Sequence, residues 1–375
     1  MKAAVIGGAG EIGSRIAQSF LTSGQPVRIV GRQRSPRLAR WSNVEFIALE
    51  LPASRQHLEE ALAGCDAVVN CVVDKKPFES DEISIRSNVE GLCALLEAAM
   101  AQGIKKFIHL STIAVLPPRL TRLDNLYDYS KETDWYSRVK IATEKAALEY
   151  RSRLDLCIVR PGIVYGPYLH WSRMAFFKTQ QYRVIVPANP ESVCHAIHVD
   201  DLVQLIRHLL HLPQKLPELM HAVNPEVITW KDFYAKHAHA LGWYDNVVGE
   251  LPEHTIRSYH DLQKRLQEEG PPLATRVLQK LRGMYHQLPA PLTQNRVSVK
   301  TIEVLKVLYH GLPFYTRLLL PPPKEDLLPN AFELELYSST ARFTPALTGC
   351  EQGFTYEIPF TEGVRMAAAW WNFQI

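Results

Sequence analysis

Residues 3–13 have the sequence Ala-Ala-Val-Ile-Gly-Gly-Ala-Gly-Glu-Ile-Gly, in which an apolar run leads directly into a cluster of glycines. The run predicts a buried strand, and Ile12, Ile16 and Phe20 mark one face of a helix that Gly24 can end. Glycines at such a junction let the backbone approach a pyrophosphate, which the amides of the helix N-terminus attract. A plain tight turn would also use these glycines, but the strand–turn–helix context favours a dinucleotide site.

The rest of the first half alternates short apolar runs with amphipathic helical patterns. The runs lie at 27–30, 44–49, 67–73, 107–110 and 156–159. They are almost continuously apolar, as expected of strands that are buried on both faces of a parallel sheet. Repeated strand–helix units imply right-handed crossovers. We therefore expect an α/β fold with a doubly wound parallel Rossmann sheet.

The second half has a different texture. One more strand–helix unit is predicted at 195–212 and a short strand at 220–223, whereas 250–329 is rich in proline and basic residues. We expect a Rossmann domain over 1–168, to which 193–224 returns. A smaller, mostly helical substrate-binding domain would comprise 169–192 and 225–375, with a cap at 250–329. This cap is expected to form a lid, and the alternative is a peripheral insertion without a chemical role.

Composition limits the classes of partner. The chain has 375 residues and a formal charge of +3, too small to indicate nucleic acid or an anionic membrane as a partner. It has no membrane-length apolar run, and the short apolar N-terminus does not fit a signal peptide. Six scattered cysteines without a CxxC pair favour a reduced, cytoplasmic protein. The paired histidines at 208/211 and 237/239 lack an obvious third ligand, so no metal site is expected.

The end of the second predicted strand bears on the choice of cofactor. An acid at this place accepts the ribose 2′-hydroxyl of NAD, whereas arginine favours the 2′-phosphate of NADP. The sequence here contains Arg32 and Arg34 and no acid. We therefore favour NADP(H), with NAD(H) as the alternative and a solvated basic loop as the plain structural explanation.

A catalytic set can be assembled from a helix and a strand end. Tyr136 and Lys140 are four residues apart in a helix predicted over 134–150, so they face the same side. A free phenol has a pKa near ~10, and a neighbouring ammonium lowers it toward the range useful for acid–base catalysis. Ser111 and Thr112 end the fifth predicted strand, where ligands bind in open α/β sheets, and can supply a hydroxyl for the substrate oxygen.

Six segments carry longer patterns, at 7–13, 88–91, 110–112, 136–140, 160–167 and 198–201. They resemble the GGxGxIG, NxxG, SS/ST, YxxxK, RPxxVYGP and HVDD motifs of the extended short-chain dehydrogenase/reductases, also called the NAD-dependent epimerase/dehydratase family. The likeness covers nearly the whole chain. It implies a Rossmann fold, a nicotinamide cofactor, a small-molecule substrate and a homodimer.

The resemblance also implies residue roles. Tyr136 would be the general acid/base, Lys140 its activator and a ligand of the nicotinamide ribose, and Thr112, rather than Ser111, the donor to the substrate oxygen. Asn88 would be a supporting polar residue, and a helix N-cap is an equally good interpretation. The expected cofactor-binding residues are Gly7, Gly10, Glu11, Ile12, Gly13, Arg32, Glu50, Leu51, Val72, Ser111, Tyr136, Lys140, Pro161 and Ile163.

Departures from the family pattern narrow the range of reactions that we expect. Nucleotide-sugar dehydratases carry an Asp-Glu pair after the catalytic Thr, whereas this chain has Ile113 and Ala114, which disfavours 4,6-dehydration. Glu50 stands where an Asp usually contacts the adenine side. The leading hypothesis is hydride transfer at an alcohol or ketone carbon of a small organic or sugar-like substrate. The alternatives are a nucleotide-sugar epimerase with tightly bound NAD and a non-catalytic NADP-binding protein.

Overall fold

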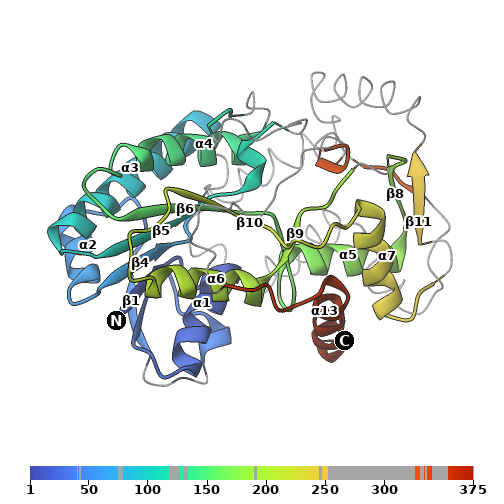
Figure 1. Ribbon diagram of the computed structural model, residues 1–375, viewed down its shortest axis with the longest axis horizontal. Coiled ribbons are helices and arrows are strands. Elements are labelled where there is room, and N and C mark those ends of the chain that lie inside the picture. The colour runs from blue at the N-terminus through green and yellow to red at the C-terminus, as the bar shows by residue number, and fades with distance from the viewer. Residues whose placement is uncertain are drawn as a thin grey trace, which may run out of the picture.

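The computed structural model describes residues 1–251, apart from 40, 42–43, 75–78, 118–126, 130–133, 190–191 and 245–246, together with 326–329, 333, 336–339 and 354–374. Figure 1 shows two lobes, a larger one built on a sheet and a smaller one beside it. The predicted cap at 250–329 lies almost entirely outside the described residues, so its role as a lid stays a prediction.

A seven-stranded parallel sheet forms the larger lobe. Its strand order is β10-β6-β5-β4-β1-β2-β3, with β1 at the point where the direction of sheet growth reverses. The strands are β1 (Ala3–Ile6), β2 (Val27–Gly31), β3 (Glu45–Ala48), β4 (Ala67–Asn70), β5 (Lys106–Leu110), β6 (Leu156–Pro161) and β10 (Leu219–Ala222). This order confirms the doubly wound Rossmann sheet, and its reversal places a crevice at the carboxyl ends of β1 and its neighbours.

Helices cover both faces of this sheet (Figure 1). One face packs against α1 (Glu11–Thr22) and α6 (Val199–His211), and the other against α2 (Arg55–Leu62), α3 (Asp81–Ala101) and α4 (Trp135–Leu148). The predicted apolar stripe of the first helix is confirmed, because Ile16 and Phe20 are fully buried. Gly24 ends this helix with φ +70°, a left-handed conformation that glycine adopts without strain.

The described part of the smaller lobe is mostly helical, as predicted, and also contains a small sheet. Its three-stranded sheet consists of β8 (Arg183–Pro187), β11 (Val248–Leu251) and β12 (Asp326–Leu327). Packed with it are α5 (His170–Gln181), α7 (Trp230–Ala240) and α13 (Phe360–Gln374). Between the lobes, β7 (Ile163–Tyr165) pairs with β9 (Ala196–His198), so the predicted strand near 195 does not join the main sheet. The domain boundaries at 168 and 224 stay predictions.

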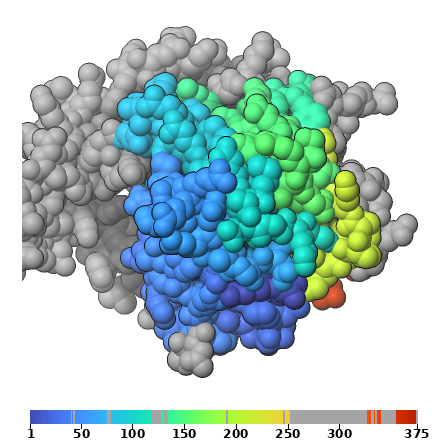
Figure 2. All heavy atoms as spheres, turned by 90° about the vertical axis from the view of Figure 1, so that its left-hand side faces the viewer, coloured from blue at the N-terminus to red at the C-terminus, as the bar shows by residue number. Residues whose placement is uncertain are grey.

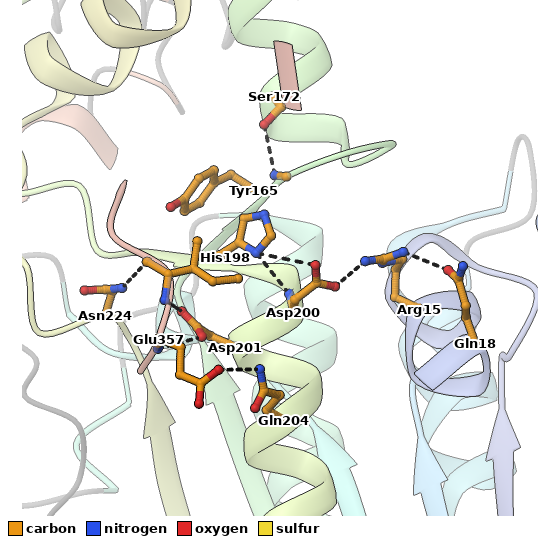
Figure 3. A network of polar contacts seen from close by, with 12 residues as sticks. Arg15, Gln18, Tyr165, Ser172, His198, Asp200, Asp201, Gln204, Asn224 and Glu357 are labelled. Atoms are coloured by element: carbon orange, nitrogen blue, oxygen red, sulfur yellow. Dashed lines mark hydrogen bonds and ion pairs between the residues drawn. The ribbon is translucent and has the colours of Figure 1, made fainter. Parts of the chain in front are cut away.

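The motif at 198–201 holds three parts of the chain together (Figure 3). Asp200 pairs with Arg15 of α1. The buried carboxylate of Asp201 accepts the backbone amides of residues 357 and 358, at 3.0 and 3.3 Å. The motif therefore has a structural role, since it fixes the segment before α13 against the sheet lobe.

The outer end of the sheet lobe is made by the first half of the chain. Figure 2 shows this side, where segments coloured blue to green form most of the surface and the yellow-green part appears only at the right-hand edge. None of the described helices combines the length and the apolar character needed to cross a bilayer.

Candidate active site

A cavity of about 640 Å³ lies at the carboxyl ends of β1, β4, β5 and β6. The predicted site residues that line it are Gly7, Gly10, Glu11, Ile12, Gly13, Ser111, Thr112, Tyr136, Lys140, Pro161 and Ile163. The other four predicted cofactor residues, Arg32, Glu50, Leu51 and Val72, are not among its lining residues. The fold thus brings the three proposed catalytic side chains to the same cavity as the glycine loop.

The glycine loop is closely packed backbone. Gly7 has φ +75°, and its amide donates to the carbonyl of Val30 at 2.8 Å. A Cβ atom on Gly13 would lie 2.3 Å from the carbonyl oxygen of Gly7, so no larger residue fits there. Gly10 precedes the first turn of α1 and provides no side-chain cap. The amides of this turn are therefore left for a ligand, and the loop fits a pyrophosphate.

Glu11 connects this loop to the smaller lobe, a contact that sequence reasoning missed. One carboxylate oxygen accepts the backbone amide of His170 at 2.9 Å, and the other pairs with Arg173. Both donors belong to α5. The family motif leaves the position of Glu11 open, so nothing in the sequence indicated that its side chain would tie the two lobes together at the edge of the cavity.

Arg32 faces the loop that follows β4. Its guanidinium lies 3.4 Å from the carboxylate of Asp74, and its side chain is 62% exposed. Arg34 is directed elsewhere, with its guanidinium 5.6 Å from the centre of the Phe46 ring. Glu50 is exposed just beyond β3. Arg32 therefore reaches the loop at the carboxyl end of β4, whereas Arg34 lines a separate cavity together with Phe46.

Leu51 and Val72 line a second, smaller cavity of about 20 Å³ together with Asn88. Asn88 lies inside α3, whose N-cap is Ser80, so the N-cap interpretation of Asn88 is wrong. Its side-chain oxygen accepts the amide of Asp74 at 3.0 Å, and its side-chain nitrogen donates to the carbonyl of the same residue at 2.7 Å. Asn88 therefore braces the loop that carries the partner of Arg32.

Tyr136 is half-buried at the start of α4 and hydrogen-bonds to Thr112. Burial raises the pKa of its phenol to about 12, the negative charge of Asp134 adds to this effect, and the bond to Thr112 opposes it. The lowered pKa that we expected from the sequence is thus not found in the protein alone, because desolvation of the phenolate is the largest effect. The Ser111 hydroxyl is buried and has no hydrogen-bond partner among the described residues.

Lys140 lies one helical turn further along and is buried. Its ammonium donates to the carbonyl of Leu110 at 2.7 Å. Burial lowers its pKa to about 8, and the charges of Cys71 and Glu144 partly oppose this shift.

Two contacts fix the helix that carries both residues. Arg160 of β6 forms two parallel bonds to Glu144 of α4, at 2.8 and 2.6 Å, and both side chains are fully buried. At the start of α4, Asp134 accepts the amide of Ser137 at 3.0 Å and its hydroxyl at 2.6 Å. Bidentate charged pairs are strong and geometrically specific, so the first turns of α4 are held in one position over the strand ends.

Several lining residues were not predicted, among them Cys71, Val73, Leu116, Asp134, Ser137, Trp171, Leu336 and Ser339. Asp134 could have been found, because Asp three residues before Ser137 at a helix start is a capping pattern. Trp171 and Leu336 carry no such signal, since they are far apart in sequence and meet only in the fold. Ile113 and Ala114 line the cavity after Thr112, at the place where dehydratases carry their acids.

The sequence pattern of the NAD-dependent epimerase/dehydratase family matches residues 3–223, more than half of the chain. The chain belongs to this family. It is therefore a member of a family of NAD-dependent enzymes with a Rossmann fold, as its motifs indicated.

Solved structures with the same fold cover the whole chain. The UDP-glucose 4-epimerase of Thermus thermophilus, in complex with NAD, is similar with a TM-score of 0.61 and 17% identity over 100% of both chains. The dTDP-glucose 4,6-dehydratase DesIV of Streptomyces venezuelae, with NAD and TYD bound, has a TM-score of 0.62 and 16% identity, covering 100% of this chain and 97% of that one. At these identities the likeness shows the fold alone.

Relatives found by sequence match a shorter region. Human sterol-4-alpha-carboxylate 3-dehydrogenase (decarboxylating) is 27% identical over 172 residues, 44% of each chain. The 4-hydroxy-2-methyl-3-oxo-4-farnesyl-3,4-dihydroquinoline-1-oxide ketoreductase of Stigmatella aurantiaca is 26% identical over 170 residues, which are 44% of this chain and 51% of that one. The chain spans about half the length of the curated relatives that it matches.

Proposed function

We propose that the protein is an NADP(H)-dependent dehydrogenase or ketone reductase that transfers hydride at an alcohol or ketone carbon. The observation that carries this proposal is the placement of Thr112, Tyr136 and Lys140 in the cavity that begins at the glycine loop. The names of the sterol dehydrogenase and the quinoline ketoreductase support hydride transfer at such a carbon.

Each of the three side chains has a proposed task. Tyr136 donates its proton to the carbonyl oxygen during reduction and accepts a proton from the hydroxyl during oxidation. Thr112 donates a hydrogen bond to the same oxygen, and beside it lies the hydroxyl of Ser111, which has no partner among the residues that the structure describes. A nicotinamide held in this cavity would supply or accept the hydride. Lys140 holds a positive charge behind Tyr136, which favours the phenolate, and is placed to contact the ribose.

The cofactor-binding residues are the glycine loop for the pyrophosphate, with Pro161 and Ile163 beside the reaction centre and Leu51, Val72 and Glu50 toward the adenosine. NADP(H) is preferred because Arg32 stands at the end of β2, where the 2′-phosphate is placed in Rossmann folds. Asp74 competes for the same guanidinium, at 3.4 Å. NAD(H) is the alternative cofactor.

A second candidate function is nucleotide-sugar epimerisation, in which a tightly held NAD oxidises the substrate and reduces it again. The NAD-dependent epimerase/dehydratase family, whose pattern matches residues 3–223, supports it. The two functions differ in how the cofactor is held. NAD that stays with the protein through purification supports the epimerase, whereas freely exchangeable NADPH supports the reductase.

The test is a comparison of Tyr136→Phe with the intact protein on a panel of carbonyl substrates, followed by NADPH absorbance. Turnover should fall at least about a hundredfold, the scale of a lost general acid, while NADPH affinity is nearly unchanged. Tyr244→Phe is the matched control, because Tyr244 is 67% exposed and is not among the cavity residues. Turnover that is equal in Tyr136→Phe and the intact protein would remove Tyr136 from the mechanism, and cofactor binding without turnover of any alcohol or ketone would favour a non-catalytic role.

A further inference from the structure

Part of the wall of the cavity that contains the proposed reaction centre is hydrocarbon. Ile113, Ala114 and Leu116 follow Thr112 and line one part of this wall. Trp171 at the start of α5 and Leu336 line another part. A wall of this composition binds carbon skeletons by removing their apolar surface from water.

Trp171 is held by its neighbours. Its ring lies 6.0 Å from the ring of His170, edge to face, and 5.8 Å from the ring of Trp230. Trp230 is almost fully buried and packs against Tyr337, with ring centres 4.5 Å apart. The indole of Trp171 therefore presents a fixed aromatic surface to the cavity, and Leu336 packs against the same cluster.

The charges of the described lining residues do not suit a second diphosphate in addition to that of the cofactor. Among the described lining residues Lys140 is the only lysine or arginine, and it already donates to Leu110. Two acids, Glu11 and Asp134, line the same space. A nucleotide sugar brings a diphosphate to the substrate side, and such groups are usually bound by arginine forks or lysines.

We propose that the substrate of this site is an uncharged, hydrocarbon-rich alcohol or ketone without a nucleoside diphosphate, and that Trp171 and Leu336 recognise its carbon skeleton. The inference rests on the proposed function. In the reducing direction, hydride from NAD(P)H forms a C–H bond at the carbonyl carbon, the C=O π pair moves to oxygen, and Tyr136 supplies the proton. The products are the alcohol, oxidised cofactor and a tyrosinate that takes a proton from solvent.

The experiment compares 1-decalone, cyclohexanone and UDP-glucose as substrates of the full chain, with NADPH and NADH. The four extra carbons of decalone should give at least about a tenfold higher kcat/KM than cyclohexanone. UDP-glucose should not be turned over, and UDP should not inhibit decalone reduction. Equal kcat/KM for the two ketones, or competition by UDP, would overturn the inference.

Substitutions in the cavity wall test which residues recognise the carbon skeleton. Trp171→Ala should lower kcat/KM for decalone about tenfold or more, lower kcat/KM for cyclohexanone by a clearly smaller factor, and leave NADPH affinity within about twofold. Phe177→Ala is the control on the same helix, since Phe177 is 38% exposed and not among the cavity residues. If Trp171→Ala does not fold, Leu336→Ala gives the same comparison. A loss for decalone that is as large in Phe177→Ala would contradict the assigned wall.

Different results would overturn the proposed substrate class and the proposed reductase function. Turnover of UDP-glucose that Tyr136→Phe abolishes would overturn the substrate class but keep a Tyr136-dependent reaction. Absence of turnover for both ketones, in protein that binds NADPH, would count against the reductase itself and the inference with it.

Discussion

The phenol of Tyr136 has a carboxylate close by, two residues before it in the chain. Asp134 lines the same cavity, and its charge helps to raise the pKa of Tyr136 to about 12. Alcohol oxidation needs the phenolate as base, so its rate should rise with pH until the phenol is ionised. The position of that rise reports on Asp134.

Asp134→Asn should therefore move the pH profile of alcohol oxidation to lower pH. Asparagine keeps the N-cap bond to the Ser137 amide but removes the negative charge that disfavours the phenolate. The measurement is kcat/KM against pH for the variant and the intact protein. Asp128→Asn, which changes an exposed carboxylate outside the cavity lining, should leave the profile in place. A profile that shifts to higher pH in Asp134→Asn would contradict this assignment.

A second prediction at this scale concerns Arg32. If it contacts the 2′-phosphate, Arg32→Ala should weaken NADPH binding by about 1.5–3 kcal/mol and NADH binding far less. Asp74→Asn should act in the opposite direction and tighten NADPH, because the carboxylate no longer competes for the guanidinium. Titration calorimetry with both cofactors checks this, and Arg34→Ala, whose guanidinium lies over Phe46, is the control. Equal weakening of NADPH and NADH in Arg32→Ala would argue for NAD(H).

Helix α4 depends on one buried ion pair. Because Arg160 and Glu144 are both fully buried, removal of one partner leaves an uncompensated charge inside the protein. Glu144→Ala should lower the free energy of unfolding by about 3–5 kcal/mol, whereas Glu149→Ala at the exposed end of the helix should change it by less than about 0.5 kcal/mol. Urea unfolding followed by circular dichroism measures both. Similar small losses in the two variants would show that α4 is held mainly by apolar packing.

Elements with a strong sequence pattern were predicted well. The central strands and helix α4 lie within three residues of their predicted bounds, because buried parallel strands are continuous apolar runs and amphipathic helices repeat every 3.6 residues. Strand β4 ends at Asn70 rather than at 73, since the Asn70 side chain accepts the amide of Val72 and the chain turns. The strands β7, β8 and β11 were missed, as short strands between helices give little periodicity.

The candidate site was likewise predictable only in part from the sequence. Motif residues such as Tyr136 and Lys140 could be found because their spacing has a chemical reason. The hydrocarbon wall of the cavity could not be found from the sequence, because Trp171 and Leu336 are brought together only by the packing of the smaller lobe. The sequence also does not indicate the partner of Arg32, since Asp74 belongs to a loop whose position depends on Asn88.

At the scale of the whole molecule, the two lobes share the segment before α13. Asp201→Ala removes the acceptor of two backbone amides, at residues 357 and 358. Amide exchange in 354–374 should accelerate roughly tenfold or more, while the central strands keep their protection. Asp200→Ala is the control, because Asp200 pairs with Arg15 on α1 instead (Figure 3). Unchanged exchange in 354–374 would show that α13 is held by its apolar contacts alone.

The position of α13 also affects how the chain folds while it is being synthesised. Phe360 and Val364 complete the apolar cluster around Tyr165 and Phe233. A growing polypeptide is synthesised from its amino end at about 5–20 residues per second. These two side chains are therefore added on the order of ten seconds after β10, the last strand of the main sheet. During that interval the cluster lacks Phe360 and Val364, so we expect Tyr165 and Phe233 to be more exposed to water than in the complete fold. The apolar cluster of the smaller lobe can therefore be completed only after α13 has been synthesised.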